Sequence, residues 1–154
     1  MSPLSASAWL AGGAANPALV GGARLVPLHS VEEARGLLTV AEVERQLPFA
    51  PRRCFVISRV PDENIRGEHA HLALHQFLVC LAGSVVAEVD DGASRRAVAL
   101  DTPRVGLHMP PMVWGAQHHY SRDAVLMVLA SAAYDPDDYV REYERFLALA
   151  RGAR

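Results

Sequence analysis

The feature that most constrains the fold of this chain is a succession of short apolar runs separated by turn residues. Strand-length runs rich in Val, Leu, Ile and Ala alternate with clusters of Gly, Pro, Asp, Asn and Ser, and Asp90-Asp91-Gly92 is a hairpin signal. This pattern, with no helical segment between the runs, is typical of antiparallel sandwiches and barrels. The expected strands lie within residues 23–31, 37–43, 52–60, 69–74, 76–89, 95–100, 105–109 and 124–131.

The C-terminal segment has a different pattern. Apolar side chains recur at helical spacing between residues 139 and 150, and the acidic stretch Asp135-Pro136-Asp137-Asp138 precedes them. Acidic side chains favour a helix N-terminus because they accept hydrogen bonds from free N–H groups and complement the helix dipole. The sequence therefore predicts one C-terminal helix packed on the β-structure.

The N-terminal segment is rich in Ala, Gly, Ser and Pro and has no Lys or Arg before Arg24. The basic start of a secretory signal is therefore missing. We expect residues 1–23 to be a poorly ordered extension. Residues 24–154 should form a single domain, because a chain of this length buries enough surface for its own core.

Composition excludes several classes of partner. The net charge is −2 and the sequence pI is near 6.4, so nothing favours binding to nucleic acid or to an anionic membrane surface. No apolar run approaches the ~20 residues of a membrane span. Cys54 and Cys80 both lie inside apolar runs, which is typical of buried, reduced thiols in a cytoplasmic protein.

Two histidines on one strand are the strongest functional signal. His69 and His71 are separated by one residue, so on a β-strand their side chains project from the same face. A single strand histidine is usually structural. Two together are harder to explain in that way, because adjacent imidazoles repel when both are charged and are costly to bury without partners.

The spacing of five residues resembles that of the first cupin motif: Gly67, His69, His71, Gln76 and Gly83. Gln76 occupies the position of the glutamate ligand in metal cupins. Gly115 occupies the position of their third histidine. Two imidazoles are too few for a divalent site, so we expect no metal. Three further histidines do not stand where the cupin motif places its metal ligands: His75, His118 and His119.

A longer set of motifs resembles one family more closely. RGEHAH, HQFLVCLAGS, DDG, VGLHMPPMVWG, VLMVLAS and YDPDDYVREYERF occur in this order between residues 25 and 147. Together they are similar to the sugar-nucleotide 3,4-ketoisomerases. The resemblance implies an antiparallel cupin or jelly-roll barrel with a C-terminal α-helix. It also implies a dTDP-4-keto-6-deoxyglucose-type substrate, whose carbonyl moves from C4 to C3.

This chemistry needs proton transfer and no redox cofactor, because hydrogen leaves C3 and returns to C4 as a proton through an enediol. Imidazole suits the task, since its unperturbed pKa of ~6.5 lets it accept and return a proton near neutral pH. The family resemblance gives His69 and His71 these catalytic roles. We expect His71 to carry the proton at C3 and His69 to shuttle or orient.

The substrate pyrophosphate calls for arginine, whose planar guanidinium binds phosphate in a bidentate way. We expect substrate contacts from these positions: Arg35, Arg53 (with Arg52 an alternative), Arg66, Gln76 and Trp114. Gln76 would offer its amide to a sugar or phosphate oxygen, and Trp114 would form a wall of the sugar pocket. The configuration at C4 of the product stays open.

Other functions remain open from the residues alone. A cupin-type sugar-nucleotide epimerase would use a histidine base with a tyrosine acid, for which Tyr120 is the candidate. A non-catalytic nucleotide-sugar-binding cupin would keep the pocket without the chemistry. A metal-dependent oxygenase would need a bound ion. The family pattern also implies a homodimer with an exchanged N-terminal strand, which would protect a sheet edge.

Overall fold

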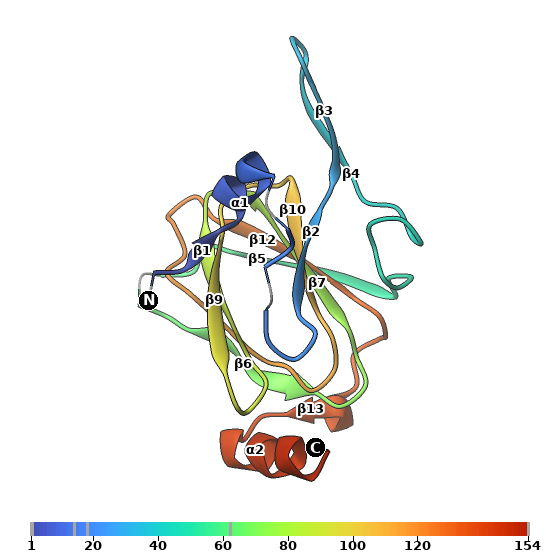
Figure 1. Cartoon of the computed structure of the whole chain (residues 1–154), viewed down its shortest axis with the longest axis vertical. Helices are drawn as coiled ribbons and strands as arrows, with labels where there is room; N and C mark the ends of the chain where they lie inside the picture. The colour runs from blue at the N-terminus through green and yellow to red at the C-terminus, as the bar shows by residue number, and fades with distance from the viewer. Residues whose placement is uncertain (1, 14, 18, 62, 154) are drawn as a thin grey trace.

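Two β-sheets packed face to face form the body of the protein (Figure 1). The structure is a computed structural model, and it describes residues 2–153 except residues 14, 18 and 62. Its elements follow in chain order: β1 (Leu4–Ser5), α1 (Ala6–Gly12), β2 (Arg24–Pro27), β3 (His29–Glu33), β4 (Gly36–Val40), β5 (Arg53–Ser58), β6 (Arg66–His71), β7 (Gln76–Ala82), β8 (Val85–Asp90), β9 (Arg95–Leu100), β10 (Val105–Met109), β11 (Trp114–His118), β12 (Val125–Ala130), the 3₁₀ turn Pro136–Asp138, β13 (Tyr139–Val140) and α2 (Tyr143–Gly152).

The expected antiparallel, all-β class is confirmed. One sheet has the order β1-β9-β8-β11-β6-β13 and the other β2-β10-β7-β12-β5, and β3 and β4 form a third, two-stranded sheet. The pairs between named strands are antiparallel apart from β1 and β9. The predicted Asp90–Gly92 turn joins β8 to β9. Strand β11 was not expected, because Gly115, Gln117 and His118 give it a weak apolar pattern.

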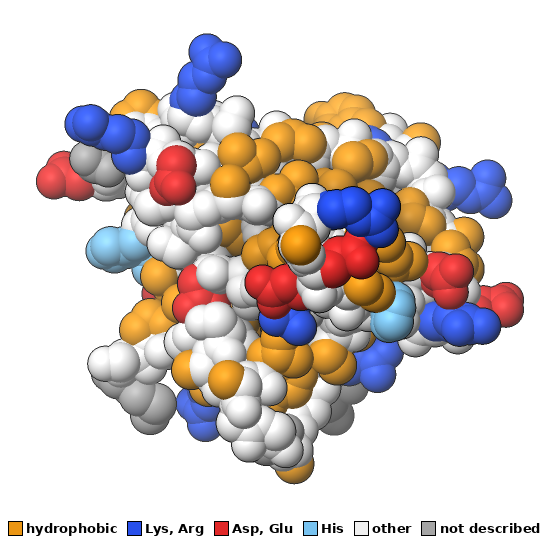
Figure 2. Space-filling view, turned by 90° about the horizontal axis from the view of Figure 1, so that it is seen from above, with side chains coloured by type: hydrophobic (Ala, Val, Ile, Leu, Met, Phe, Trp, Pro, Cys, Tyr) orange, Lys and Arg blue, Asp and Glu red, His pale blue; other side chains and the backbone are white. Residues whose placement is uncertain are grey.

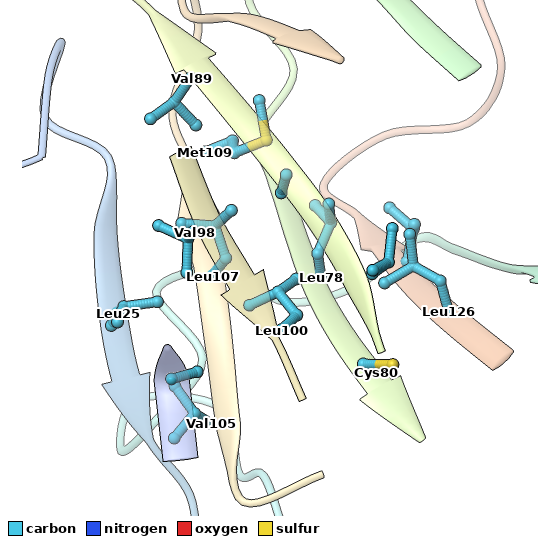
Figure 3. Close-up of a cluster of buried hydrophobic side chains, with 14 of the residues drawn as sticks. Leu25, Leu78, Cys80, Val89, Val98, Leu100, Val105, Leu107, Met109 and Leu126 are labelled. Atoms are coloured by element: carbon cyan, nitrogen blue, oxygen red, sulfur yellow. The ribbon is translucent and has the colours of Figure 1, made fainter. Parts of the chain in front are cut away.

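The main core lies between the two sheets. Alternate residues of β8 are buried there, namely Val85, Ala87 and Val89, because successive side chains on a strand point to opposite faces. They belong to one cluster with side chains of the other sheet such as Leu78 and Leu107, and Figure 3 shows Val89, Leu78 and Leu107 in this cluster. The core therefore fixes which face of each strand is internal.

The C-terminal helix is confirmed, but it begins later than predicted. Tyr139 and Val140 pair with His71 and Ala70 of β6, so these two residues form β13, and α2 starts at Tyr143. The helix then buries Phe146 and Ala150 in a small cluster with Ala70, Val140 and Trp114. Helical spacing did not reveal β13 because strand pairing with β6 is a long-range interaction.

Within residues 1–23, the described part contains β1 and α1. Ser5 caps the helix by accepting a hydrogen bond from the Ala8 N–H, and its hydroxyl also donates to Asp101 at 2.7 Å. Ala6 is fully buried, and Leu4, Trp9 and Leu10 pack against the main core. The division of the chain at residue 24 into extension and domain stays a prediction.

The β3–β4 hairpin projects from the body at the end opposite α2 (Figure 1). Three of its apolar residues are exposed: Val31, Leu37 and Leu38. Figure 2, which views the molecule from this end, shows hydrophobic side chains among scattered charges of both signs. The hairpin thus makes few contacts within its own chain.

Two smaller expectations can be compared with the structure. Both described cysteines are free, and Cys80 is buried as expected. Cys54 is exposed, so its predicted burial was wrong; alternate residues of β5 face outward, and Cys54 is one of them. Among the residues described, neither helix is long and apolar enough to cross a membrane.

Candidate functional site

The two histidines lie together on the inner face of β6. His69 is directly opposite Gly115 of β11, which is opposite the buried Val89 of β8, so these residues share the face that lines the interior. The ring centroids of His69 and His71 are 4.8 Å apart at 88°, and their Nε2 atoms are 3.2 Å apart. The predicted projection from one face is therefore what the structure shows.

Each ring is held by its other nitrogen. The Nδ1 atom of His69 lies 2.9 Å from the Gly67 carbonyl oxygen, and that of His71 lies 2.9 Å from Oδ2 of Asp138. The same Asp138 carboxylate accepts the backbone N–H of Ala73 at 2.8 Å. The His71 side chain is only 5% exposed, so its orientation is fixed by packing as well as by Asp138.

Burial keeps the histidine pair uncharged at neutral pH. The pKa of His71 is lowered to about 4, chiefly by burial and then by the neighbouring His69, with Asp138 opposing both. The pKa of His69 is also lowered by burial, against the hydrogen bond to Gly67, and Arg141 adds to the lowering. Both imidazoles are thus available as bases.

Aromatic and cationic side chains surround the pair. The Tyr139 ring lies 4.8 Å from the ring of His69 and 4.4 Å from that of His71, and the Arg141 guanidinium lies 4.2 Å from the Tyr139 ring. On another side, Arg53 acts electrostatically on His71 and stacks over Phe55. Two arginines therefore act near the pair, against the single carboxylate of Asp138, and they favour an anionic ligand.

Arg53 and Gln76 are the predicted binding residues that lie near the pair. Arg53 is opposite Ala130, and Ala130 is opposite Gln76, so the two side chains share one face of the second sheet. The buried Nε and Nη2 atoms of Arg53 have no hydrogen-bond partner among the described residues. Buried donors without an acceptor are costly, so Arg53 is suited to receive an anion.

The other predicted binding residues lie elsewhere. Arg66 is exposed at the start of β6, and Arg35 forms a salt bridge with Glu33 beside the exposed tip of the hairpin. Trp114 faces the outer side of its sheet, against Tyr143 and Phe146, and so does not line the histidine site. The single chain does not bring these three residues together with the histidines.

The outer face of the β8–β11–β6 sheet carries a cavity of about 1070 Å³. Trp114, Glu88, His118 and Tyr143 are among its lining residues, whereas His69 and His71 are not. His118 is paired with Glu88 there at 3.1 Å. We place the candidate site at the histidine pair because the chemistry-bearing groups converge there.

Sequence reasoning missed three residues of the site: Asp138, Tyr139 and Arg141. All three belong to the motif YDPDDYVREYERF, but the acidic run was interpreted only as a helix start. The available signal was the presence of acidic and aromatic residues in a matched family motif. As to metals, the described part of the chain contains no group of three or more His, Cys, Asp or Glu side chains arranged to hold an ion.

Comparison with known proteins assigns the family. The model of the family described as "FdtA: WxcM-like, C-terminal" matches residues 21–151. The chain belongs to this family. The predicted resemblance to the sugar-nucleotide 3,4-ketoisomerases is confirmed by the relatives described next.

One relative is the TDP-4-oxo-6-deoxy-alpha-D-glucose-3,4-oxoisomerase of Aneurinibacillus thermoaerophilus. It is 41% identical over 123 residues, which is 80% of this chain and 88% of the relative. A mutant of the 3,4-ketoisomerase QdtA from Thermoanaerobacterium thermosaccharolyticum, solved with TDP-4-keto-6-deoxyglucose, is 32% identical with a TM-score of 0.84, covering 87% and 97% of the two chains. The TDP-quinovose 3,4-ketoisomerase WlaRB of Campylobacter jejuni is 31% identical with a TM-score of 0.80, covering 84% and 99%.

Proposed function

We propose that this protein is a 3,4-ketoisomerase that acts on a TDP-4-keto-6-deoxyglucose-type nucleotide sugar. The 41% identical relative carries that activity in its name, and similar solved structures are TDP-sugar 3,4-ketoisomerases. The observation that carries the proposal to this chain is the pair of uncharged imidazoles, whose Nε2 atoms are 3.2 Å apart. Arg53, which acts electrostatically on His71, has buried Nε and Nη2 atoms with no hydrogen-bond partner among the described residues.

The proposed reaction is a pair of proton transfers. An imidazole removes the proton from C3, and the electrons of the C–H bond pass into an enediolate stabilised by the neighbouring carbonyl. That proton is delivered to C4, and the hydroxyl proton of O3 is transferred to O4, so the carbonyl moves from C4 to C3. No electron leaves the sugar, so the reaction needs no redox cofactor, and the histidines are proposed to transfer the proton between the two carbons.

Arg53 and Gln76 are proposed to bind the substrate from the second sheet. Arg53 supplies donors that lack an acceptor within the described chain, and the pyrophosphate of the substrate would supply that acceptor. Gln76 is 9% exposed and offers an amide that donates to, or accepts from, a sugar oxygen. Arg66, at the start of the histidine strand, would contact the phosphates from the rim.

We further propose a homodimer in which the N-terminal β3–β4 hairpin is exchanged. The hairpin extends away from its own body and exposes Leu37 and Leu38, which a second copy would cover. Exchange also gives a role to Arg35, whose side chain is 87% exposed near the hairpin tip. In the dimer, Arg35 of one copy would reach the histidine site of the other.

The test is incubation with TDP-4-keto-6-deoxyglucose in D₂O, followed by NMR. A 3,4-ketoisomerase yields a 3-keto sugar, and C4 of this product carries deuterium only where the proton held by the histidines exchanges with solvent before it is delivered. An epimerase would keep the ketone at C4 and introduce deuterium at C3. A non-catalytic binding protein would bind the sugar without any exchange, and either of these two results would contradict the proposal.

A further inference from the structure

The hydrogen positions on the histidine pair follow from its neighbours. The Gly67 carbonyl and the ionised Asp138 carboxylate can only accept hydrogen bonds, so each histidine carries its hydrogen on Nδ1. A neutral imidazole has one ring hydrogen, and both rings are uncharged at neutral pH because burial lowers their pKa values. Both Nε2 atoms therefore present lone pairs, and these converge across 3.2 Å.

Asp138 is held firmly enough to impose this state on His71. Its backbone carbonyl accepts the Leu72 N–H at 2.9 Å, which ties the residue to the end of β6. Its Oδ1 accepts the Ala73 N–H at 2.8 Å, and its Oδ2 faces both His71 Nδ1 at 2.9 Å and the Leu74 N–H at 3.3 Å. The carboxylate is thus oriented by backbone groups and not by the histidine alone.

We propose that Asp138 is the positioning residue of the catalytic pair, holding His71 with its hydrogen on Nδ1 so that both Nε2 atoms jointly accept the substrate proton. This inference rests on the 3,4-ketoisomerase function proposed above. The proton leaves C3 for an Nε2 lone pair and is shared in the gap between the two nitrogens. The Asp138 carboxylate balances the positive charge until the proton is delivered to C4.

The substitution Asp138→Asn keeps the shape of the side chain, removes its charge and reverses the hydrogen bond to His71. The amide oxygen of Asn is required by the Ala73 N–H, the shorter backbone contact, so the amide NH₂ group faces His71 Nδ1. His71 then accepts at Nδ1 and carries its hydrogen on Nε2, where it donates to His69. This hydrogen lies between the two Nε2 atoms before the substrate binds, so neither Nε2 atom has a free lone pair to accept the substrate proton.

The experiment compares Asp138→Asn with the wild type by steady-state kinetics and by ¹⁵N NMR of the histidine rings. We expect kcat to fall by ~10⁴, the loss found when the orienting carboxylate of a Ser-His-Asp triad becomes an amide, with little change in KM. The ring spectra should show His71 protonated on Nδ1 in the wild type and on Nε2 in the variant. Asp137→Asn is the matched control, since it removes one charge from the neighbouring exposed residue and should leave both readouts unchanged.

The outcomes distinguish this inference from the proposed function. If the wild type isomerises the sugar but Asp138→Asn keeps kcat within about tenfold, the positioning role is wrong and the function stands. The same conclusion follows if wild-type His71 carries its hydrogen on Nε2 at neutral pH, a measurement that does not require the variant to fold. If the wild type shows the expected ring spectra but no isomerisation, the function is wrong and the orientation by Asp138 stands.

Discussion

At the residue scale, the site depends on two imidazoles that differ in burial and in partner. His71 is almost fully enclosed and is held by a carboxylate, whereas His69 is more exposed and is held by a backbone carbonyl. The more exposed ring is the easier one for a substrate to reach. The buried ring of His71 is the one whose positive charge, once it holds the substrate proton, is balanced by the Asp138 carboxylate. We therefore expect both rings to be needed.

Loss of either ring should therefore reduce turnover strongly. We expect His71→Ala and His69→Ala each to lower kcat by ~10²–10⁴, the usual contribution of a positioned acid or base. Nucleotide binding, measured by calorimetry with TDP, should persist because Arg53 is untouched. His118→Ala is the control, since His118 lies on the outer face with Glu88 and should keep full activity. Full turnover in His71→Ala would contradict the proposed mechanism.

Buried histidines also make stability depend on pH. His71 and His108 both have a pKa lowered to about 4, mainly by burial, against ~6.5 in the unfolded chain. The unfolded chain therefore binds more protons between about pH 6.5 and pH 4, and stability falls as pH decreases through this window. Each group contributes on the order of 3 kcal/mol to the loss.

Substitution of His108 tests this dependence away from the active site. His108 lies in the second sheet with its Nδ1 buried and without a partner in the described residues, and it contacts His75 at 3.0 Å. In His108→Leu, the decrease in Tm between neutral pH and about pH 5 should be clearly smaller than in the wild type. His29→Ala, at an exposed position, should behave like the wild type. An unchanged pH dependence in His108→Leu would contradict the assignment.

The residue scale also shows what sequence can and cannot reveal about the site. The alternation of a strand was enough to place His69 and His71 on one face, because that relation is local. Asp138 is 67 residues away from His71 in the sequence, and no local rule connects them. Trp114 was expected in the sugar pocket, but pairing of β11 with β6 puts its side chain on the outer face.

At the scale of elements, the β3–β4 hairpin is the segment whose role a single chain does not explain. Five residue pairs join its strands, yet the hairpin forms a separate two-stranded sheet. An isolated hairpin is marginally stable in water, so a partner surface would stabilise it. The proposed exchange provides that surface and places Arg35 in the neighbouring site.

This arrangement predicts complementation between two inactive variants. In a mixed dimer of His71→Ala and Arg35→Ala, one site combines an intact His71 with an intact Arg35 from the other chain. Co-expressed, differently tagged chains should therefore recover activity toward half of a wild-type dimer, whereas each parent dimer stays weak. Absence of recovery in purified mixed dimers would contradict the contribution of Arg35 across the interface.

The association itself has a separate test. Leu38 is 60% exposed, and Leu38→Asp should shift the protein toward monomer in sedimentation or light scattering, because a buried unpaired charge opposes association. Leu149→Asp, on the exposed side of α2 at the other end of the molecule, is the matched control and should leave the assembly unchanged. An unchanged mass for Leu38→Asp would exclude this part of the hairpin from the interface.

Element boundaries were predictable where one local pattern governed them. Strands β5, β7, β9, β10 and β12 lie within the expected ranges, and β8 exceeds its range by one residue, because their apolar residues alternate or run continuously between turns. The start of α2 was displaced because Tyr139 and Val140 gain more from pairing with β6 than from extending the helix. The choice between helix and strand at these two residues depends on tertiary contacts, so the local sequence pattern does not reveal it.

At the scale of the whole molecule, the first twenty residues lie outside the part of the chain that the family model matches. The family model begins at residue 21, and the QdtA structure is matched over 97% of its own length but 87% of this chain. This segment adds β1 beside β9 as the edge strand of one sheet, and Asn16 donates to the Leu25 carbonyl of β2, the edge strand of the other sheet, at 2.6 Å. It therefore contacts an edge of each sheet.

We expect removal of this N-terminal segment to destabilise the protein. Deletion of residues 2–20 exposes the surface under Leu4, Ala6, Trp9 and Leu10, and we expect the free energy of unfolding to fall by roughly 3 kcal/mol. The newly free edge of β9 should also increase self-association. Chemical denaturation and light scattering measure the two effects. Unchanged values would instead support the description of residues 1–23 as a poorly ordered extension.

The pairing of β13 with β6 has a consequence for synthesis. The strand that carries the histidines leaves the ribosome well before Asp138, which follows His71 by 67 residues. A nascent chain can therefore assemble most of both sheets while its imidazoles still lack their counter-charge. Competence for proton transfer arrives only when the last segment docks, so activity reports completed translation rather than early folding.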